Sequence, residues 1–447
     1  MTPPEVAVDR CLAAFDRSPG RGTGGPSWLR RLREEAKERF AAAGFPDGKN
    51  EDWKYTSVAA IASLPFESAS IGGGELSPSD VSRHVSGGAP GNVLVFENGR
   101  YRADLSVRRL LPPGVHLGSL SAALSGGGEG LVPFFSRPPA NAFTDLNTML
   151  MEDGAFLHVG KGVEVPEPIR LLFLTSGGGR QVVSHPRNVI VAGEGSRVTV
   201  VERYAGRSDD GCFVNAVTDI SAGEGATVVH YRLREDGTGA YHVASLRVRQ
   251  GTGSRFAAHS VSLGARLSRS DVHAVLEGED AVCLLNGLYL GNGEQHVDHF
   301  TTIDHAKPGG SSREYYRGIL DGRSRGVFRG RVIVRRDAQK TDARQANRNL
   351  LLSEDAEADS RPQLEIHADD VKCTHGATVG PIDEEKVFYL RSRGIDASSA
   401  RGLLAFAFAA DILRRFDLPD VRRAYEEKLL AWLPEAGRIR EILHGHE

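Results

Sequence analysis

Short runs of β-branched and apolar residues alternate with glycine-containing turns from about residue 155 onward. The turn Ala-Gly-Glu-Gly occurs at 192–195 and again at 222–225, each time followed by a valine-containing run. Turns at 251–253 and 278–280 continue the series, and the first glycines of these four turns are separated by 30, 28 and 27 residues. Residues 160–162 form an earlier candidate member of the same repeat.

A repeat of about 30 residues, built from strands and turns without intervening helices, is typical of a β-solenoid. One coil of a solenoid cannot bury its apolar face alone, so neighbouring coils must stack. A β-sandwich is the alternative, because regularly spaced turns also occur there. The close return of Ala-Gly-Glu-Gly favours the solenoid and predicts a mainly β protein.

Both ends of the chain have helical patterns. In the first 45 residues, apolar residues recur at spacings of three and four, and Gly44 and Pro46 end the pattern. A second helical pattern follows Gly394, with Pro419 starting its last helix. The sequence therefore predicts an N-terminal helical or mixed domain at 1–150, a β core at 151–395 and a C-terminal helical domain at 396–447.

A solenoid also has an exposed strand edge at each end, and such edges pair with other chains unless they are covered. The N-terminal helices are candidates to cap one end. The other end, around 330–390, is a candidate for pairing with a partner protein.

Charge and composition exclude several classes of protein. The 55 basic and 58 acidic residues give a net charge of −3, which excludes a strongly basic nucleic-acid binder and gives no reason to expect a membrane-surface protein. The longest apolar run, 403–410, is far shorter than the ~20 residues that span a bilayer. The N-terminus lacks the pattern of a signal peptide, and the four cysteines are dispersed. We therefore expect a cytoplasmic protein.

Cys373 and His375 are the most concentrated candidates for chemistry. On a strand, residues two apart point to the same face, with Cα atoms about 6.5–7 Å apart. A thiolate and an imidazole on one face can bind a soft or borderline metal, and Lys372 could favour the thiolate. An isolated pair of this kind is more commonly a buried cysteine beside a surface histidine. The other cysteines are 90 or more residues away, so a metal site here would need ligands from distant coils or from a second protein.

A second group of polar residues fits no standard motif and is expected on exposed strand faces: His296, Asp298, His299, Asp304 and His305. Cys212 and Cys283 are expected in the core. The chain contains no P-loop and no Gly-x-Ser-x-Gly motif, so neither ATP hydrolysis through a P-loop nor an α/β-hydrolase mechanism is expected.

Several longer segments resemble the SufB/SufD proteins of the SUF iron–sulfur cluster assembly machinery, and the SufD branch most closely. The similar segments are 340–342, 347–352, 362–366, 368–380 and 388–395, together with 50–56 near the N-terminus. Gly376 follows the histidine of the motif, where SufB-type proteins typically carry glutamate. The resemblance covers essentially the whole chain.

The resemblance implies a right-handed parallel β-helix between N-terminal and C-terminal helical domains. It further implies a non-catalytic scaffold subunit that pairs with SufB through β-helix strands and binds the ATPase SufC through its C-terminal region. By the same resemblance, His375, with Cys373 as a weaker candidate, would hold iron or a transient iron–sulfur cluster at the SufB–SufD interface, and no cofactor would be permanently bound.

Two alternatives remain open at this point. A β-helix enzyme acting on polysaccharide would need a groove of carboxylates and aromatic residues, and such enzymes are commonly secreted; the aromatic content of 7% and the N-terminal sequence argue against it. The other alternative is a metal-binding protein that forms a homodimer on its own.

Overall fold

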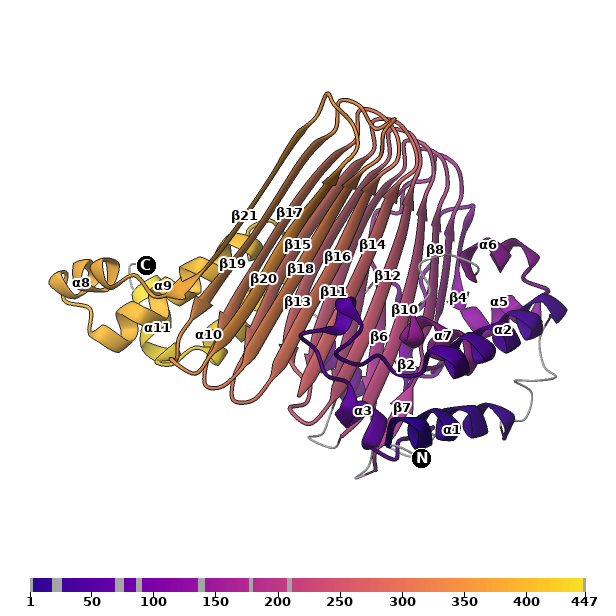
Figure 1. Cartoon of the computed structure of the whole chain (residues 1–447), viewed down its shortest axis with the longest axis horizontal. Coiled ribbons are helices and arrows are strands. Elements are labelled where there is room, and N and C mark those ends of the chain that lie inside the picture. Colours follow the sequence, from indigo (N-terminus) through magenta and orange to yellow (C-terminus); the bar gives the residue numbers. More distant parts are fainter. Residues whose placement is uncertain are drawn as a thin grey trace.

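The computed structural model describes residues 3–17, 26–68, 76–85, 91–135, 141–176, 180–206 and 211–444. A long parallel β-solenoid occupies the middle of the molecule, with helices at both ends (Figure 1). This arrangement confirms the mainly β architecture and the flanking helices predicted from the hydrophobic pattern.

Two sheets form the walls of the solenoid. The first runs, in spatial order, through β20 (Glu357–Ile366), β18 (Arg325–Val334), β16 (His296–His305), β14 (Leu267–Leu276), β12 (Tyr241–Gln250), β10 (Phe213–Ala222), β8 (Arg187–Ala192), β5 (Ala155–Val159) and β4 (Val115–Ser119). The second runs through β21 (Lys372–Pro381), β19 (Asp342–Leu351), β17 (Ser311–Leu320), β15 (Val282–Gly291), β13 (Arg255–Gly264), β11 (Thr227–Asp236), β9 (Arg197–Gly206), β6 (Ile169–Thr175), β2 (Val93–Glu97) and β3 (Arg100–Tyr101). From β8 to β21 the chain alternates between the sheets, so each coil adds one parallel strand to each wall.

The glycine repeat marks one corner of successive coils. Gly195, Gly225 and Gly253 have φ angles of 64°, 63° and 62°, a left-handed conformation that glycine adopts without a steric cost. The Gly195 amide donates to the Glu224 carbonyl at 2.7 Å, and the Gly225 amide donates to the Thr252 carbonyl at 2.8 Å. The turns therefore stack on one another as the strands do, which establishes the solenoid and excludes the β-sandwich.

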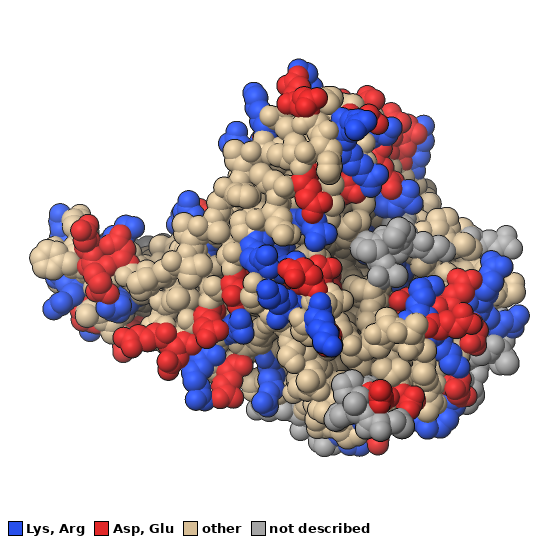
Figure 2. All heavy atoms as spheres, in the orientation of Figure 1, with Lys and Arg blue, Asp and Glu red and all other residues tan. Residues whose placement is uncertain are grey.

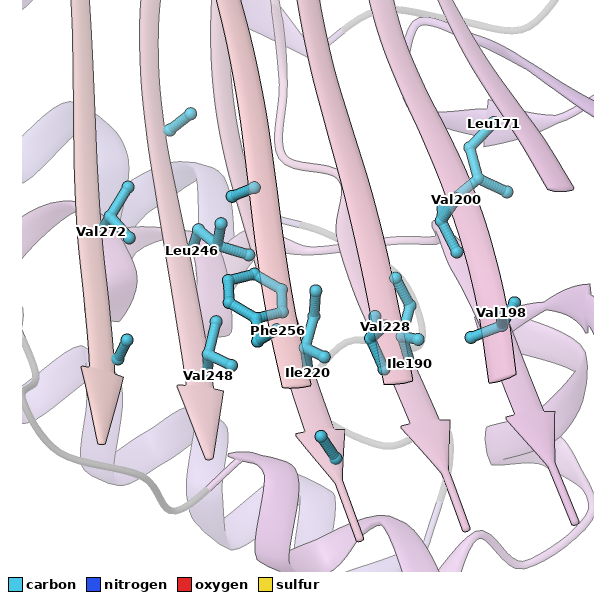
Figure 3. Close-up of a cluster of buried hydrophobic side chains, with 14 of the residues drawn as sticks. Leu171, Ile190, Val198, Val200, Ile220, Val228, Leu246, Val248, Phe256 and Val272 are labelled. Carbon is cyan, nitrogen blue, oxygen red and sulfur yellow. The ribbon is translucent and has the colours of Figure 1, made fainter. Parts of the chain in front are cut away.

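The core lies between the two walls, where alternate residues of each strand point inward (Figure 3). Because neighbouring strands are parallel and in register, equivalent residues form columns along the solenoid. Val198, Val228 and Phe256 form one such column in β9, β11 and β13. The interior is not purely apolar: Glu202, His230 and Arg232 are buried on the same inward faces and interact with one another. Toward β19, the amide side chains of Gln345, Asn347 and Asn349 point inward.

Antiparallel strands end both sheets on the N-terminal side, because β4 pairs with β5 and β3 pairs with β2. A short pair, β1 (Glu67–Ser68) and β7 (Val182–Ser184), lies beside β10. The helices in this region are α1 (Pro3–Asp16), α2 (Ser27–Ala43), η1 (Glu51–Trp53), α3 (Ala59–Ser63), α4 (Pro78–His84), α5 (Leu120–Ser125), η2 (Glu129–Leu131), α6 (Val132–Phe135) and α7 (Ala142–Leu150).

The C-terminal helices are α8 (Glu384–Ser392), α9 (Ala397–Leu413), α10 (Pro419–Trp432) and α11 (Ala436–His444). Helix α8 directly follows the last strand, so helical structure begins before residue 396. The later helices pack on the outer face of the second sheet. Tyr231 of β11 stacks edge-on against Phe416, and its hydroxyl accepts the backbone N–H of Asp417 at 2.9 Å. Among the described residues, no helix is both long and apolar enough to cross a membrane.

Candidate ligand site at the open end of the solenoid

The last coil leaves the solenoid open. Within the part of the chain that the structure describes, β20 and β21 have neighbours on one side only, whereas β19 is paired on both sides. Most of β21 is exposed, and apolar side chains such as Ile366 and Val379 are 42% and 46% exposed. Unpaired strand edges combined with exposed apolar residues are typical of a surface that a further strand covers.

Cys373 and His375 both lie on the inward-facing side of this last strand. In the in-register pairing of β21 with β19, Cys373 stands beside Ala343 and His375 beside Gln345, and both partners are buried. Cys373 is half-buried against the apolar residues at this end, whereas His375 is exposed because no further coil covers it. The structure thus places the two side chains on one face, as their spacing predicts.

The expectation that Lys372 favours the thiolate is wrong. Lys372 pairs in register with Asp342 on the opposite face of β21, and burial raises the pKa of the Cys373 thiol above its usual value of 9.0. Cys373 is therefore a protonated thiol at neutral pH, and a metal would have to displace that proton. His375 is the more accessible of the two side chains.

The donor set at this end is incomplete. In the described ranges, no three or more His, Cys, Asp or Glu side chains come together as a group that could hold a metal ion. The acidic residues near this strand already have partners: Asp342 forms an ion pair with Arg313, and Asp370 forms one with Lys340. A metal or cluster bound here would need further ligands from outside the described part of the chain.

Four residues of the second polar group are buried and His296 is half-buried, whereas the sequence predicted exposed strand faces. Asp298, His299 and His305 are at most 1% exposed, because both faces of β16 are covered. His299 and His305 point into the interior, whereas Thr56 covers the outer face, where its hydroxyl lies 2.9 Å from His296 Nε2 and donates to Asp298 at 2.5 Å. The group is divided between two faces, so it does not form a ligand cluster. Cys212 and Cys283 are buried, as predicted.

The N-terminal segment 50–56 runs across the outer face of the first sheet toward the open end. Arg269 of β14 donates to the Asp52 carbonyl at 2.9 Å and stacks on Trp53, Arg329 of β18 donates to the Glu51 carbonyl, and Arg361 of β20 contacts the Glu51 carboxylate at 3.0 Å. Figure 1 shows this indigo segment in front of the strands, and Figure 2 shows basic and acidic side chains intermixed in the middle of the same view. We call residues 50–56 the brace.

A buried polar pair lies directly behind His375. Glu314 of β17 and Gln345 of β19 occupy the same column as His375, and Gln345 Nε2 donates to Glu314 Oε2 at 2.6 Å. Burial raises the pKa of Glu314 to about 7. Neither residue was identified from the sequence alone. Their spacing follows the repeat, because Gln345 lies 31 residues after Glu314 and His375 lies 30 residues after Gln345.

Comparison with known proteins identifies the family. Residues 173–408 match the model described as SUF system FeS cluster assembly, SufBD core domain, and residues 23–171 match the SufBD protein N-terminal region. An iron–sulfur cluster assembly SufBD family protein of Synechocystis is 32% identical over 407 residues, covering 89% of each chain.

Two relatives carry the name iron–sulfur cluster assembly protein SufD. The one from Escherichia coli is 32% identical over 378 residues, covering 84% of this chain and 86% of the relative. The one from Bacillus subtilis is 25% identical over 413 residues, covering 89% and 92%. With the solenoid and the Cys373–His375 strand in place, these matches show that the chain belongs to the SufBD family of the SUF iron–sulfur cluster assembly system.

Proposed function

We propose that this chain is a SufD-type scaffold subunit, without catalysis of its own, that holds iron or a nascent iron–sulfur cluster as cargo at an interface with a SufB-like partner. The observation that carries the proposal is the incomplete donor set at an uncovered end of the solenoid. His375 lies on the inward-facing side of the last strand, next to the edge at which a partner strand would add, and a protein that completed the coil would bring its own ligands to the same place.

Strand pairing is the mode of association that we propose for the partner. A SufB-like strand added to β20 or β21 would satisfy backbone groups at the edge and cover Ile366 and Val379. This mode of binding draws its affinity from main-chain hydrogen bonds and its specificity from side-chain pockets. A second copy of this chain could pair with the same strand edge. Measuring the mass of the purified protein with and without the SufB-like subunit therefore distinguishes a heteromer from a homodimer.

The test of the ligand role is His375→Ala, co-expressed with the partner subunits. We expect the complex to assemble and to retain much less iron and acid-labile sulfide. Thr378→Ala is the matched control, because Thr378 is an exposed residue of the same strand on the opposite face. If the His375→Ala complex assembles and its iron and sulfide content equals that of the control, His375 is not a ligand.

The ATPase SufC is the second partner that we propose, docked on the C-terminal helices. Phe388 and Tyr389 of α8 are 72% and 57% exposed, so two large aromatic side chains are available there for contact with a partner. Deletion of 396–447 is a poor test, because these helices cover apolar residues of β11, β13 and β15, including Tyr231, Val261 and Leu288. Their removal would expose part of the core.

Point substitutions on α8 test this docking without disturbing that core. We expect Phe388→Ala combined with Tyr389→Ala to weaken co-purification of the ATPase, while the melting temperature stays unchanged. Leu110→Ala is the control, since Leu110 is an exposed apolar residue in the N-terminal part of the chain. Undiminished ATPase binding by the α8 variant would exclude this face as the docking site.

No observation favours the alternative of a polysaccharide-acting enzyme, and the chain belongs to the SufBD family.

A further inference from the structure

The interior column that ends at His375 contains two buried polar residues that the proposed ligand role does not itself require. Glu314, Gln345 and His375 stand in register on β17, β19 and β21, so their side chains project in the same direction from three successive coils. Glu314 is completely buried and Gln345 is 3% exposed. Buried polar groups without partners are costly, so each atom of this pair should be accounted for.

The Gln345 amide is held in one orientation. Its Nε2 donates to Glu314 Oε2 at 2.6 Å, and this bond forms in either protonation state of Glu314, because a protonated carboxyl keeps an acceptor oxygen. The side chain extends over Gly330 of the opposite sheet, where the Cβ of any other residue would overlap Nε2. Glycine at 330 therefore leaves the room that the amide occupies.

The other atom of this amide is left without a partner. Gln345 Oε1 is buried and accepts no hydrogen bond from any residue that the structure describes. The next residue in the column is His375, one coil further out. An imidazole that binds a metal through one nitrogen usually donates its other N–H to a carbonyl or carboxylate, which fixes the tautomer and the orientation of the ring.

We infer that Gln345 is the positioning residue of His375: its Oε1 accepts the imidazole N–H when the coil end is covered, and this leaves the second ring nitrogen free to bind iron. Glu314 supports the arrangement by holding the amide so that its oxygen faces outward. The inference deepens the proposed function and rests on it, because it assigns an orienting partner to the same ligand.

The test is a double-mutant cycle on the complex with the partner subunits, titrated anaerobically with ferrous iron alone. Gln345→Met keeps the length of the side chain and removes the acceptor; Gln345→Leu replaces it if the Met variant does not assemble. We expect Gln345→Met to weaken iron binding 10- to 100-fold, the usual effect of losing an orienting partner. In the His375→Ala background the same substitution should have no further effect. Asn349→Leu, a buried amide of the same strand, is the control and should leave iron affinity unchanged.

The outcomes separate this inference from the proposed function. If His375→Ala weakens iron binding and Gln345→Met does not, His375 remains a ligand and Gln345 does not position it. If Gln345→Met weakens binding equally in the presence and absence of His375, Gln345 acts on the structure of the coil and the inference is overturned. If His375→Ala leaves iron affinity unchanged, the ligand role itself fails, and the positioning role fails with it.

Discussion

The guanidinium carbon of Arg269 lies 3.8 Å from the centroid of the Trp53 ring. The two residues are far apart in sequence, and the same guanidinium forms an ion pair with Asp298 at 2.6 Å. A cation stacked on an aromatic ring and screened from water is strongly held. This contact fastens the brace to the solenoid at β14, and Glu51 extends the attachment to β18 and β20.

Trp53→Ala should destabilise the protein substantially. Trp53 is 4% exposed, so its loss leaves a cavity and uncovers Arg269, at a cost of about 3–5 kcal/mol of unfolding free energy. Urea denaturation followed by circular dichroism measures the shift in the midpoint. Trp53→Phe should recover part of the loss, and Tyr389→Ala, at an exposed aromatic residue, should change nothing. An unchanged midpoint for Trp53→Ala would show that the brace contributes no stability.

Glu51→Gln should loosen the terminal strand without unfolding the protein. The Glu51–Arg361 ion pair is largely exposed, and such pairs contribute below about 1 kcal/mol. The expected result is faster hydrogen exchange in peptides covering β20, with global stability nearly unchanged, and a smaller difference at high salt. Glu194→Gln removes a comparable exposed pair with Lys161 far from this end and serves as the control. Equal exchange in β20 of both variants would contradict the role of the brace.

Glu314 should make stability depend on pH. Its pKa rises from 4.5 to about 7 on folding, so the native state keeps a proton that the unfolded state releases between these values. The free energy of unfolding should therefore fall as pH increases from about 4.5 to about 7, by on the order of 3 kcal/mol. Glu314→Gln should lack this decrease and should be more stable than the parent protein at pH 8. Melting temperatures measured across this range give the comparison, and parallel profiles for the two proteins would refute it.

Gly318→Ala should destabilise the solenoid, because a Cβ at this position would overlap the Tyr289 ring and the Asn349 side chain. Overpacking of this kind costs about 1–3 kcal/mol. Gly376→Ala is the matched control: Gly376 also lies on a strand of the second sheet, but a Cβ there meets nothing within 4 Å. Thermal denaturation of both variants should separate them, and equal melting temperatures would mean that the interior near Tyr289 adjusts freely.

Local patterns in the sequence were sufficient for the repeating part of the fold. The recurrence of Ala-Gly-Glu-Gly marked corners that need a left-handed residue, and the two-residue spacing of Cys373 and His375 placed both on one face. These features could be predicted because strand alternation and coil length depend on residues close together in the sequence and not on distant contacts.

The tertiary structure alone decided which polar residues are buried and which positions meet. The sequence predicted that Asp298 lies on an exposed strand face. In the structure it is covered by Thr56 of the brace, which is 242 residues away in the sequence. Lys372, adjacent to Cys373 in the sequence, lies on the other face of the strand, whereas Gln345 and Glu314, a full coil or two away, lie behind His375. These contacts depend on the register in which the coils stack and on the path of the N-terminal segment across them. The local pattern of polar and apolar residues specifies neither the stacking register nor that path.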